Sequence, residues 1–216
     1  MTRDQAKAMI QGVGIIPGVR ANSAEDALYA AETAYNAGIP LAEITMTVPD
    51  APRVIQQLAK RFPNMVVGAG TVLDADTARA CVDAGARFLT STGLVPEVIE
   101  IALANHILAI PGALTPSEVI TAWKAGADYV KIFPAAPLGG DQYIRSLKLP
   151  LPQVELIAAG GVNQVTVSGF IRAGASAVGI GSELLPKDAV RRRQDDRIHE
   201  LARRFWVFVK DAREGW

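Results

Sequence analysis

The chain has 216 residues, half of them hydrophobic, and its 22 basic residues balance its 22 acidic residues. This balance gives no support for binding nucleic acid or an anionic membrane, because both partners require a basic excess. The single cysteine, Cys81, excludes an internal disulfide and a multi-cysteine metal site. No apolar run is long enough to span a membrane, and the first residues lack the apolar region of a signal peptide. We therefore expect a cytoplasmic protein.

Helical patterns alternate with short apolar segments along the chain. The helical patterns end in Gly or Asn, the residues that accept the left-handed conformation just past a helix end. These stops are Gly38, Asn64, Gly85, Asn105, Gly126 and Gly174. Eight apolar segments are predicted to be strands, at residues 13–19, 41–47, 65–71, 88–91, 107–111, 129–133, 154–159 and 177–180.

Four polar residues after these segments mark helix starts: Ser23, Asp74, Thr115 (followed by Pro116) and Asn163. Eight strands alternating with helices predict a parallel sheet, and eight βα units close most economically into a (β/α)₈ TIM barrel of the α/β class. An open doubly wound sheet would place a glycine-rich fingerprint after the first strand, and residues 17–20 do not form one.

We expect a single barrel domain over residues 1–216, with a C-terminal helix from about residue 190. The mixed charges that begin with Arg191, Arg192 and Arg193 are interpreted as a solvated helix face rather than a binding patch. Phe205 recurs at helical spacing with its apolar neighbours and is expected to pack on the barrel, with Trp206 facing elsewhere.

The sixth apolar segment carries a lysine, Lys131, at its centre. Burial strips an ammonium of water and favours the neutral amine, which can attack a ketone to form a Schiff base. The alternative is a lysine that reaches the strand end or pairs with a carboxylate. Glu43 lies in the second segment, where a carboxylate is costly unless it is paired or protonated. If both side chains point into the barrel, they form a nucleophile and an acid/base partner.

Catalytic groups of such barrels stand at the C-terminal ends of the strands and on the following loops. Arg20 follows the first strand, where it could bind a carboxylate or phosphate through two hydrogen bonds. The alternative is an arginine on the protein surface. Thr71 offers a hydroxyl where the glycine-rich third segment ends. The turns after the last two strands contain Gly160 with Gly161, and Gly181 with Ser182. Their backbone N–H groups are predicted to bind a phosphate, the alternative being plain turns.

The remaining polar candidates are interpreted as structural. Cys81 has small neighbours and is expected to pack in the core. His106 precedes the fifth strand and His199 lies in the terminal helix, so both are assigned structural or surface positions. No cluster of His, Cys, Asp or Glu has metal-ligand spacing, so no metal is expected.

Five short motifs together resemble the 2-keto-3-deoxy-6-phosphogluconate (KDPG) aldolase family, which includes the 6-phosphogalactonate (KDPGal) enzymes. The motifs are Glu43-Ile44-Thr45, Gly68-Ala69-Gly70-Thr71-Val72-Leu73, Pro111-Gly112, Lys131-Ile132-Phe133-Pro134 and Gly160-Gly161-Val162. The resemblance extends over residues 13–185. It implies a cofactor-free class I aldolase on a (β/α)₈ barrel, a homotrimer, that cleaves a phosphorylated keto acid to pyruvate and glyceraldehyde 3-phosphate.

The resemblance also implies roles for single residues. Lys131 would form the Schiff base, and Glu43 would shuttle protons through a water. Further positions would bind the substrate. Thr71 would hold the pyruvate carboxylate, and Gly160, Gly161, Gly181 and Ser182 would bind the phosphate. Phe133 and Pro111, together with Thr47 and Ala159 at positions where the family pattern has other residues, would lie around the pocket.

Three positions depart from the phosphogluconate-specific pattern. Thr47 stands where those members carry an arginine, Ala159 where they carry a threonine before Gly-Gly, and Thr92 where they carry a proline. Arg20 instead matches an arginine of the galactonate-type members, so we expect it to supply the carboxylate contact. This favours the galactonate epimer or a relaxed specificity. Two other functions remain open: an aldolase for unphosphorylated 4-hydroxy-2-oxo acids, and a non-catalytic barrel that binds a phosphorylated metabolite.

Overall fold

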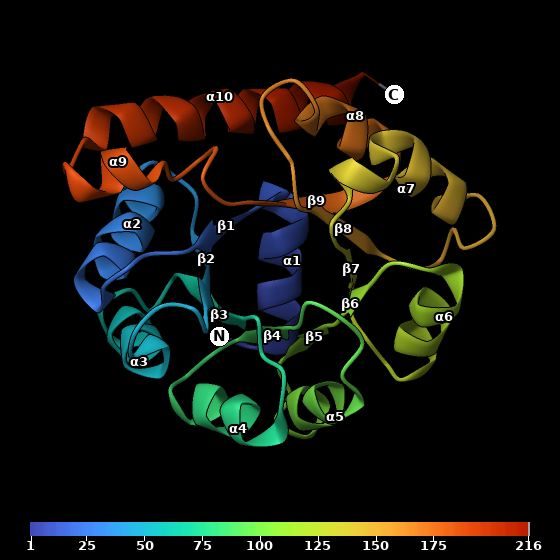
Figure 1. Cartoon of the computed structure of the whole chain (residues 1–216), viewed down its shortest axis with the longest axis horizontal. Helices are drawn as coiled ribbons and strands as arrows, with labels where there is room; N and C mark the ends of the chain where they lie inside the picture. Colours follow the sequence, from blue (N-terminus) through green and yellow to red (C-terminus); the bar gives the residue numbers. More distant parts are fainter. Residues whose placement is uncertain (216) are drawn as a thin grey trace.

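Nine short parallel strands form a nearly closed barrel in the computed structural model, which describes residues 1–215 (Figure 1). The strands are β1 (Ile15–Val19), β2 (Leu41–Thr45), β3 (Val66–Gly70), β4 (Phe88–Thr90), β5 (Leu108–Ile110), β6 (Gly112–Ala113), β7 (Val130–Ile132), β8 (Leu156–Ala159) and β9 (Ala175–Ile180). Their order in the sheet is β5-β4-β3-β2-β1-β9-β8-β7-β6. The TIM-barrel prediction is confirmed.

The two edge strands, β5 and β6, are consecutive in the chain and are separated only by Pro111. Proline has no backbone N–H and therefore interrupts a ladder of hydrogen bonds. The fifth expected segment, residues 107–111, contains only β5, and β6 follows it as a short strand that the sequence analysis did not predict. The ring closes through the chain between these two strands. Each of the eight expected segments contains a strand, although most of these strands are shorter than predicted.

Helices surround the sheet on all sides (Figure 1). They are α1 (Arg3–Val13), α2 (Ala24–Asn36), α3 (Ala51–Arg61), α4 (Ala75–Asp83), α5 (Pro96–Ala104), α6 (Pro116–Lys124), the 3₁₀ helix η1 (Ala136–Leu138), α7 (Gly140–Lys148), α8 (Val167–Arg172), α9 (Lys187–Arg191) and α10 (Asp195–Glu214). Ser23, Asp74 and Thr115 accept hydrogen bonds from the first turns of α2, α4 and α6, as predicted.

The helix start predicted at Asn163 is wrong by a few residues. Its side-chain oxygen accepts hydrogen bonds from the N–H groups of Val165 and Thr166, which makes a turn, and α8 begins only at Val167. Asparagine stabilises such turns as readily as helix starts, so the sequence pattern alone does not separate the two structures.

Helix α1 covers the N-terminal end of the barrel and crosses the centre of the ring in Figure 1. Two side chains hold it there. Arg3 Nη2 lies 2.9 Å from Oδ1 of Asp128, just before β7, and the hydroxyl of the buried Tyr129 donates to the carbonyl of Lys7. The sequence analysis assigned no helix to this segment and gave Val13, the last residue of α1, to the first strand. The N-terminal end is therefore closed, and access to the barrel interior is left to the opposite end.

The C-terminal helix α10 packs against α8 and α2, with Phe205 buried and Trp206 45% exposed, as expected. The mixed-charge run that begins at Arg191 is exposed, as expected, but it is not one continuous helix face, because Arg191 ends α9 and Asp195 begins α10. Arg193 lies in the turn between α9 and α10 with φ of 53°, and it forms ion pairs with Glu25 (3.0 Å) and Asp26 (2.7 Å) of α2. Within residues 1–215, every helix is too short or too polar to cross a membrane.

Candidate active site

Lys131 and Glu43 meet inside the barrel. Lys131 is the middle residue of β7 and Glu43 the middle residue of β2, strands that are not neighbours in the sheet. Lys131 Nζ lies 3.1 Å from Oε1 and 3.4 Å from Oε2 of Glu43, and each residue is only 6% exposed. A charge buried this deeply is costly unless an opposite charge offsets it. Both side chains point inward, which is the condition under which the sequence analysis joined them as nucleophile and acid/base partner.

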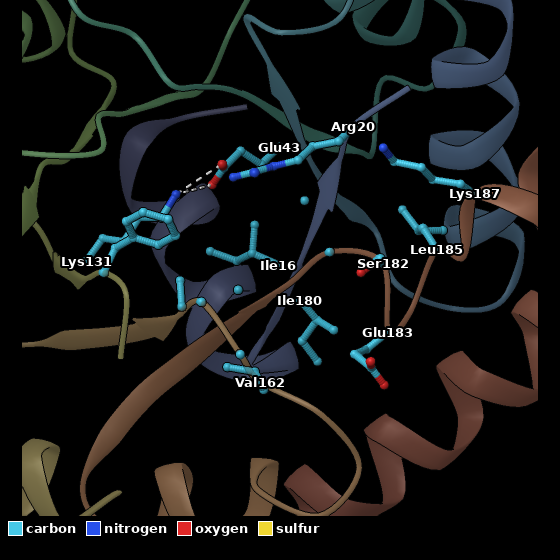
Figure 2. A pocket seen from close by; sticks show the side chains of 17 residues that line it. Ile16, Arg20, Glu43, Lys131, Val162, Ile180, Ser182, Glu183, Leu185 and Lys187 are labelled. Carbon is cyan, nitrogen blue, oxygen red and sulfur yellow. Dashed lines mark hydrogen bonds and ion pairs between the residues drawn. The ribbon is translucent and has the colours of Figure 1, made fainter. Parts of the chain in front are cut away.

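The pair opens into a cavity of about 420 Å³ at the C-terminal end of the barrel (Figure 2). The Phe133 ring forms part of its wall, with its centroid 5.9 Å from Lys131 Nζ. The loop after β1 contributes Arg20, whose side chain reaches along the wall toward Glu43 in Figure 2. The other expected residues in the wall are Ala159, Gly160, Gly161, Gly181 and Ser182. Nine of the twelve predicted site residues therefore surround one cavity.

Two loops form the end of the cavity farther from the lysine (Figure 2). Gly160 and Gly161 have φ of 86° and 82°, values that glycine adopts without strain. Within residues 1–215, no group accepts a hydrogen bond from the N–H of Gly161 or of Ser182. Such free N–H groups in a concave turn attract an anion. Since α8 starts only at Val167, the N–H groups of the turn itself, rather than the start of a helix, would supply the contacts to an anion.

Three predicted substrate-binding residues do not line the cavity. Thr47 is exposed beyond the end of β2, with its hydroxyl 2.6 Å from that of Thr45. Pro111 is buried between β5 and β6. Thr71 directly follows β3, is partly buried, and has φ of 60°. Their assigned roles stay predictions.

Sequence reasoning missed residues that do belong to the site. Lys187, the first residue of α9, lines the cavity, and the Thr90 hydroxyl lies 3.4 Å from Lys131 Nζ. A basic residue after the last strand, and a hydroxyl at the last position of β4, were the signals available. The rule that strand ends carry the chemistry selects both positions, but it selects many others too.

The residues interpreted as structural lie away from the cavity. Cys81 is fully buried, with Sγ 3.6 Å from Sδ of Met46, and burial raises the pKa of its thiol to about 11. His106 is exposed at the opposite end of the barrel, and His199 lies on α10. Among residues 1–215, no three His, Cys, Asp or Glu side chains come together in a group that could hold a metal ion.

The family model described as "Aldolase: KDPG and KHG aldolase" matches residues 6–201. The chain belongs to this aldolase family. A "KHG/KDPG aldolase" of Escherichia coli strain K12 is 29% identical over 201 residues, which cover 93% of this chain and 94% of the relative. A "Probable 2-dehydro-3-deoxy-6-phosphogalactonate aldolase" of Rhizobium meliloti is 34% identical over 175 residues, which cover 80% of each chain.

A solved structure gives the chemistry of this aldolase family directly. The KDPG aldolase of Legionella pneumophila, with pyruvate captured as a covalent carbinolamine intermediate, is 31% identical and has a TM-score of 0.84. The comparison covers 91% of this chain and 96% of that structure. The present chain is therefore an enzyme, a Schiff-base aldolase and carbon–carbon lyase, and the non-catalytic alternative is wrong.

Proposed function

We propose that this aldolase cleaves a 2-keto-3-deoxy-6-phospho sugar acid to pyruvate and glyceraldehyde 3-phosphate, through a Schiff base on Lys131. One observation carries the proposal. The buried Lys131–Glu43 pair lies at one end of a cavity whose other end carries the free N–H groups of Gly161 and Ser182. A substrate with a ketone at one end and a phosphate at the other fits this distribution of groups.

Schiff-base formation begins within the ion pair. Lys131 transfers a proton to Glu43, and the neutral amine attacks C2 of the substrate while the carbonyl π electrons move to oxygen. A proton then passes from nitrogen to oxygen, giving a carbinolamine. Glu43 returns the first proton to this oxygen, which leaves as water. The nitrogen keeps one hydrogen as a protonated imine, and Glu43 is again a carboxylate.

Cleavage uses the same carboxylate as a base. Glu43, directly or through a water, takes the proton of the C4 hydroxyl, and C4 becomes an aldehyde. The electron pair of the C3–C4 bond moves toward the protonated imine, which becomes an enamine. Glu43 then protonates C3, and water releases pyruvate from Lys131. Each step needs the carboxylate within hydrogen-bond reach of the reacting groups, which its 3.1 Å contact with Nζ supports.

The two acidic groups of the substrate would be held separately. The N–H groups of Gly161 and Ser182 would bind the phosphate, and Lys187, which also lines the cavity, would add a positive charge. Arg20 would grip the carboxylate next to C2, because its guanidinium presents two parallel donors. Arg20 in the wall favours the KDPGal epimer or a relaxed specificity at C4, and turnover of both epimers side by side tests this preference.

Borohydride trapping tests the assignment of Lys131. Reduction in the presence of pyruvate should add one pyruvate-derived mass to the tryptic peptide that carries Lys131, and a Lys131→Ala variant should neither be labelled nor turn over. Lys148 is a matched control because its amine instead donates to the carbonyls of Pro152 and Val154. A labelled lysine elsewhere, or full turnover by Lys131→Ala, would refute the proposal.

An aldolase for unphosphorylated acids is the competing function, since the matching family includes KHG (2-keto-4-hydroxyglutarate) aldolases. Comparison of kcat/KM for KDPG, KDPGal and KHG decides between them. Ser182→Ala keeps the backbone N–H and removes only the side-chain hydroxyl, which also belongs to a residue of the cavity wall. If this hydroxyl donates a further hydrogen bond to the phosphate, we expect its removal to raise KM for the phosphorylated substrates by about tenfold and to leave KHG turnover nearly unchanged. Equal loss on both substrate classes would argue against a phosphate site.

We also propose that the enzyme is a single-domain homotrimer of the cytoplasm. The family resemblance supports the trimer, and the closed barrel of residues 1–215 supports one domain. Sedimentation equilibrium of the purified protein tests the oligomer, with a monomeric or dimeric mass as the contradicting result.

A further inference from the structure

The Thr90 hydroxyl contacts the amine of Lys131, in addition to the two carboxylate oxygens of Glu43. Thr90 is the last residue of β4 and is 1% exposed, with Oγ1 3.4 Å from Lys131 Nζ. Within residues 1–215 this is the only hydrogen bond of the Thr90 side chain. Thr90 does not line the cavity, whereas Lys131 and Glu43 do. The hydroxyl therefore contacts the amine from within the barrel interior, away from the space that the substrate would fill.

The Thr90 hydroxyl could accept a hydrogen bond from the nitrogen of Lys131 both before and after the imine forms. An ammonium has three hydrogens to donate, and it finds acceptors in both oxygens of Glu43 and in Thr90. After Schiff-base formation the nitrogen keeps one hydrogen. If Glu43 remained the acceptor of that hydrogen, it would be held away from the C4 hydroxyl and C3, where its proton transfers are needed.

We propose that Thr90 is a positioning residue for the Schiff-base nitrogen: its hydroxyl accepts the N–H of the protonated imine and thereby leaves Glu43 free to move protons. This inference rests on the proposed function of Lys131. A neutral hydroxyl is suited to the task, because it supports the iminium hydrogen bond without competing as a base. The hydroxyl itself is buried, with Thr90 only 1% exposed, so bulk water does not compete for it.

A buried strand threonine could also serve packing alone, and valine separates the two roles because it has nearly the same shape. Thr90→Val keeps the volume and removes the hydroxyl, and Thr90→Ser keeps the hydroxyl and removes a methyl group. Thr33, a buried threonine of α2, supplies the control variant Thr33→Val, which removes a buried hydroxyl outside the cavity.

Two measurements distinguish imine formation from the proton transfers that follow it. Borohydride trapping at saturating pyruvate reports the imine, and deuterium exchange at the pyruvate methyl group, followed by NMR, reports proton removal at C3. We expect Thr90→Val to slow exchange and kcat by about tenfold, the effect of one hydrogen bond to a charged group, with trapping and KM within about threefold of the parent enzyme. Thr90→Ser should recover most of the exchange rate, and Thr33→Val should lose none.

The inference would be overturned if Thr90→Val exchanged the pyruvate methyl protons at the rate of the parent enzyme. It would also be overturned if Thr90→Ser exchanged them as slowly as Thr90→Val. If circular dichroism shows that Thr90→Val is unfolded, the comparison of Thr90→Ala with Thr90→Ser decides in the same way. The proposed function fails separately: it does so if the unsubstituted enzyme gives no pyruvate adduct at Lys131, whatever the Thr90 variants do.

Discussion

Gly70 of β3 leaves open the space that the carboxylate of Glu43 fills on the neighbouring strand β2. A Cβ placed on Gly70 would lie 2.7 Å from both Cγ and Cδ of Glu43, closer than packed carbon atoms approach. The same relationship recurs two residues earlier on the same face, where Gly68 makes room for the ring of Phe88. The glycines of β3 therefore accommodate side chains from both neighbouring strands, and Gly70 sets where the Glu43 carboxylate, the proposed acid and base, can lie.

We expect Gly70→Ala to lower kcat by about 10- to 100-fold, because even a displacement of about 1 Å moves Glu43 out of reach of the reacting groups. KM should change less, since the free N–H groups of the proposed phosphate site are untouched. Steady-state kinetics and borohydride trapping measure the effect. Gly12→Ala is the control, because a Cβ there meets nothing within 4 Å. Full activity of a folded Gly70→Ala enzyme would contradict the assigned role of Glu43.

Arg20 gives a prediction about substrate affinity. Its side chain is exposed in the loop after β1 and lines the cavity. Arg20→Gln removes the charge and the paired donors, so we expect KM for the keto acid, and the pyruvate concentration needed for half-maximal trapping, to rise by about 10- to 100-fold. Arg87→Gln is the matched control, since Arg87 is exposed just before β4, at the other end of the barrel. An unchanged KM would place the carboxylate elsewhere.

The barrel and much of its site could be predicted because local signals and long-range packing agree. Glycine stops, helix caps and apolar segments are local features, and each of the three caps confirmed above is a contact between residues three positions apart. The Lys131–Glu43 pair was predictable for another reason: two buried charges of opposite sign, each costly alone, have to find each other.

What could not be predicted depends on the three-dimensional arrangement of distant residues. The position of α1 over the barrel end depends on Arg3 meeting Asp128, 125 residues later in the sequence. The Thr90–Lys131 contact depends on how far β4 and β7 are rotated around the ring, which no spacing in the sequence encodes. The mixed-charge run is interrupted between α9 and α10 because Arg193 adopts a left-handed conformation that its ion pairs with α2 stabilise.

The Asp128 carboxylate should matter for stability and not for catalysis. It is nearly buried, accepts from Arg3 and from the N–H of Ala109, and lies at the barrel end opposite the cavity. Asp128→Asn removes the charge from this network, and we expect urea unfolding to show a loss of about 1–3 kcal/mol with kcat unchanged. Asp76→Asn is the control, because its pair with Arg79 is exposed and worth little. A stability equal to that of the parent enzyme would show that the charge of Asp128 does not help to hold α1 in place.

Cys81 gives a prediction about reactivity. Burial raises the pKa of its thiol from the ordinary value of 9.0 to about 11, so almost no thiolate exists in the folded protein at pH 8. Because the thiolate is the reactive form, and because the side chain is also inaccessible, an aromatic disulfide reagent should leave the native enzyme unlabelled. The same reagent should label one thiol per chain in urea. Rapid labelling of the native protein would contradict the burial of Cys81.

The raised pKa of the Cys81 thiol also makes the stability of the folded protein depend on pH in the alkaline range. Between about pH 9 and pH 11 the folded state holds the thiol proton more tightly than the unfolded state, so stability falls as the pH rises through this range. Below that range the contribution of Cys81 is fully present. Tyr29 also has a raised pKa, about 12, because of burial and its hydrogen bond to Asp195, so the comparison needs a variant. The urea midpoint should fall less between pH 8 and pH 10 for Cys81→Ala than for the parent enzyme. If the midpoint falls equally in both proteins, the loss of stability at alkaline pH comes from the tyrosines instead.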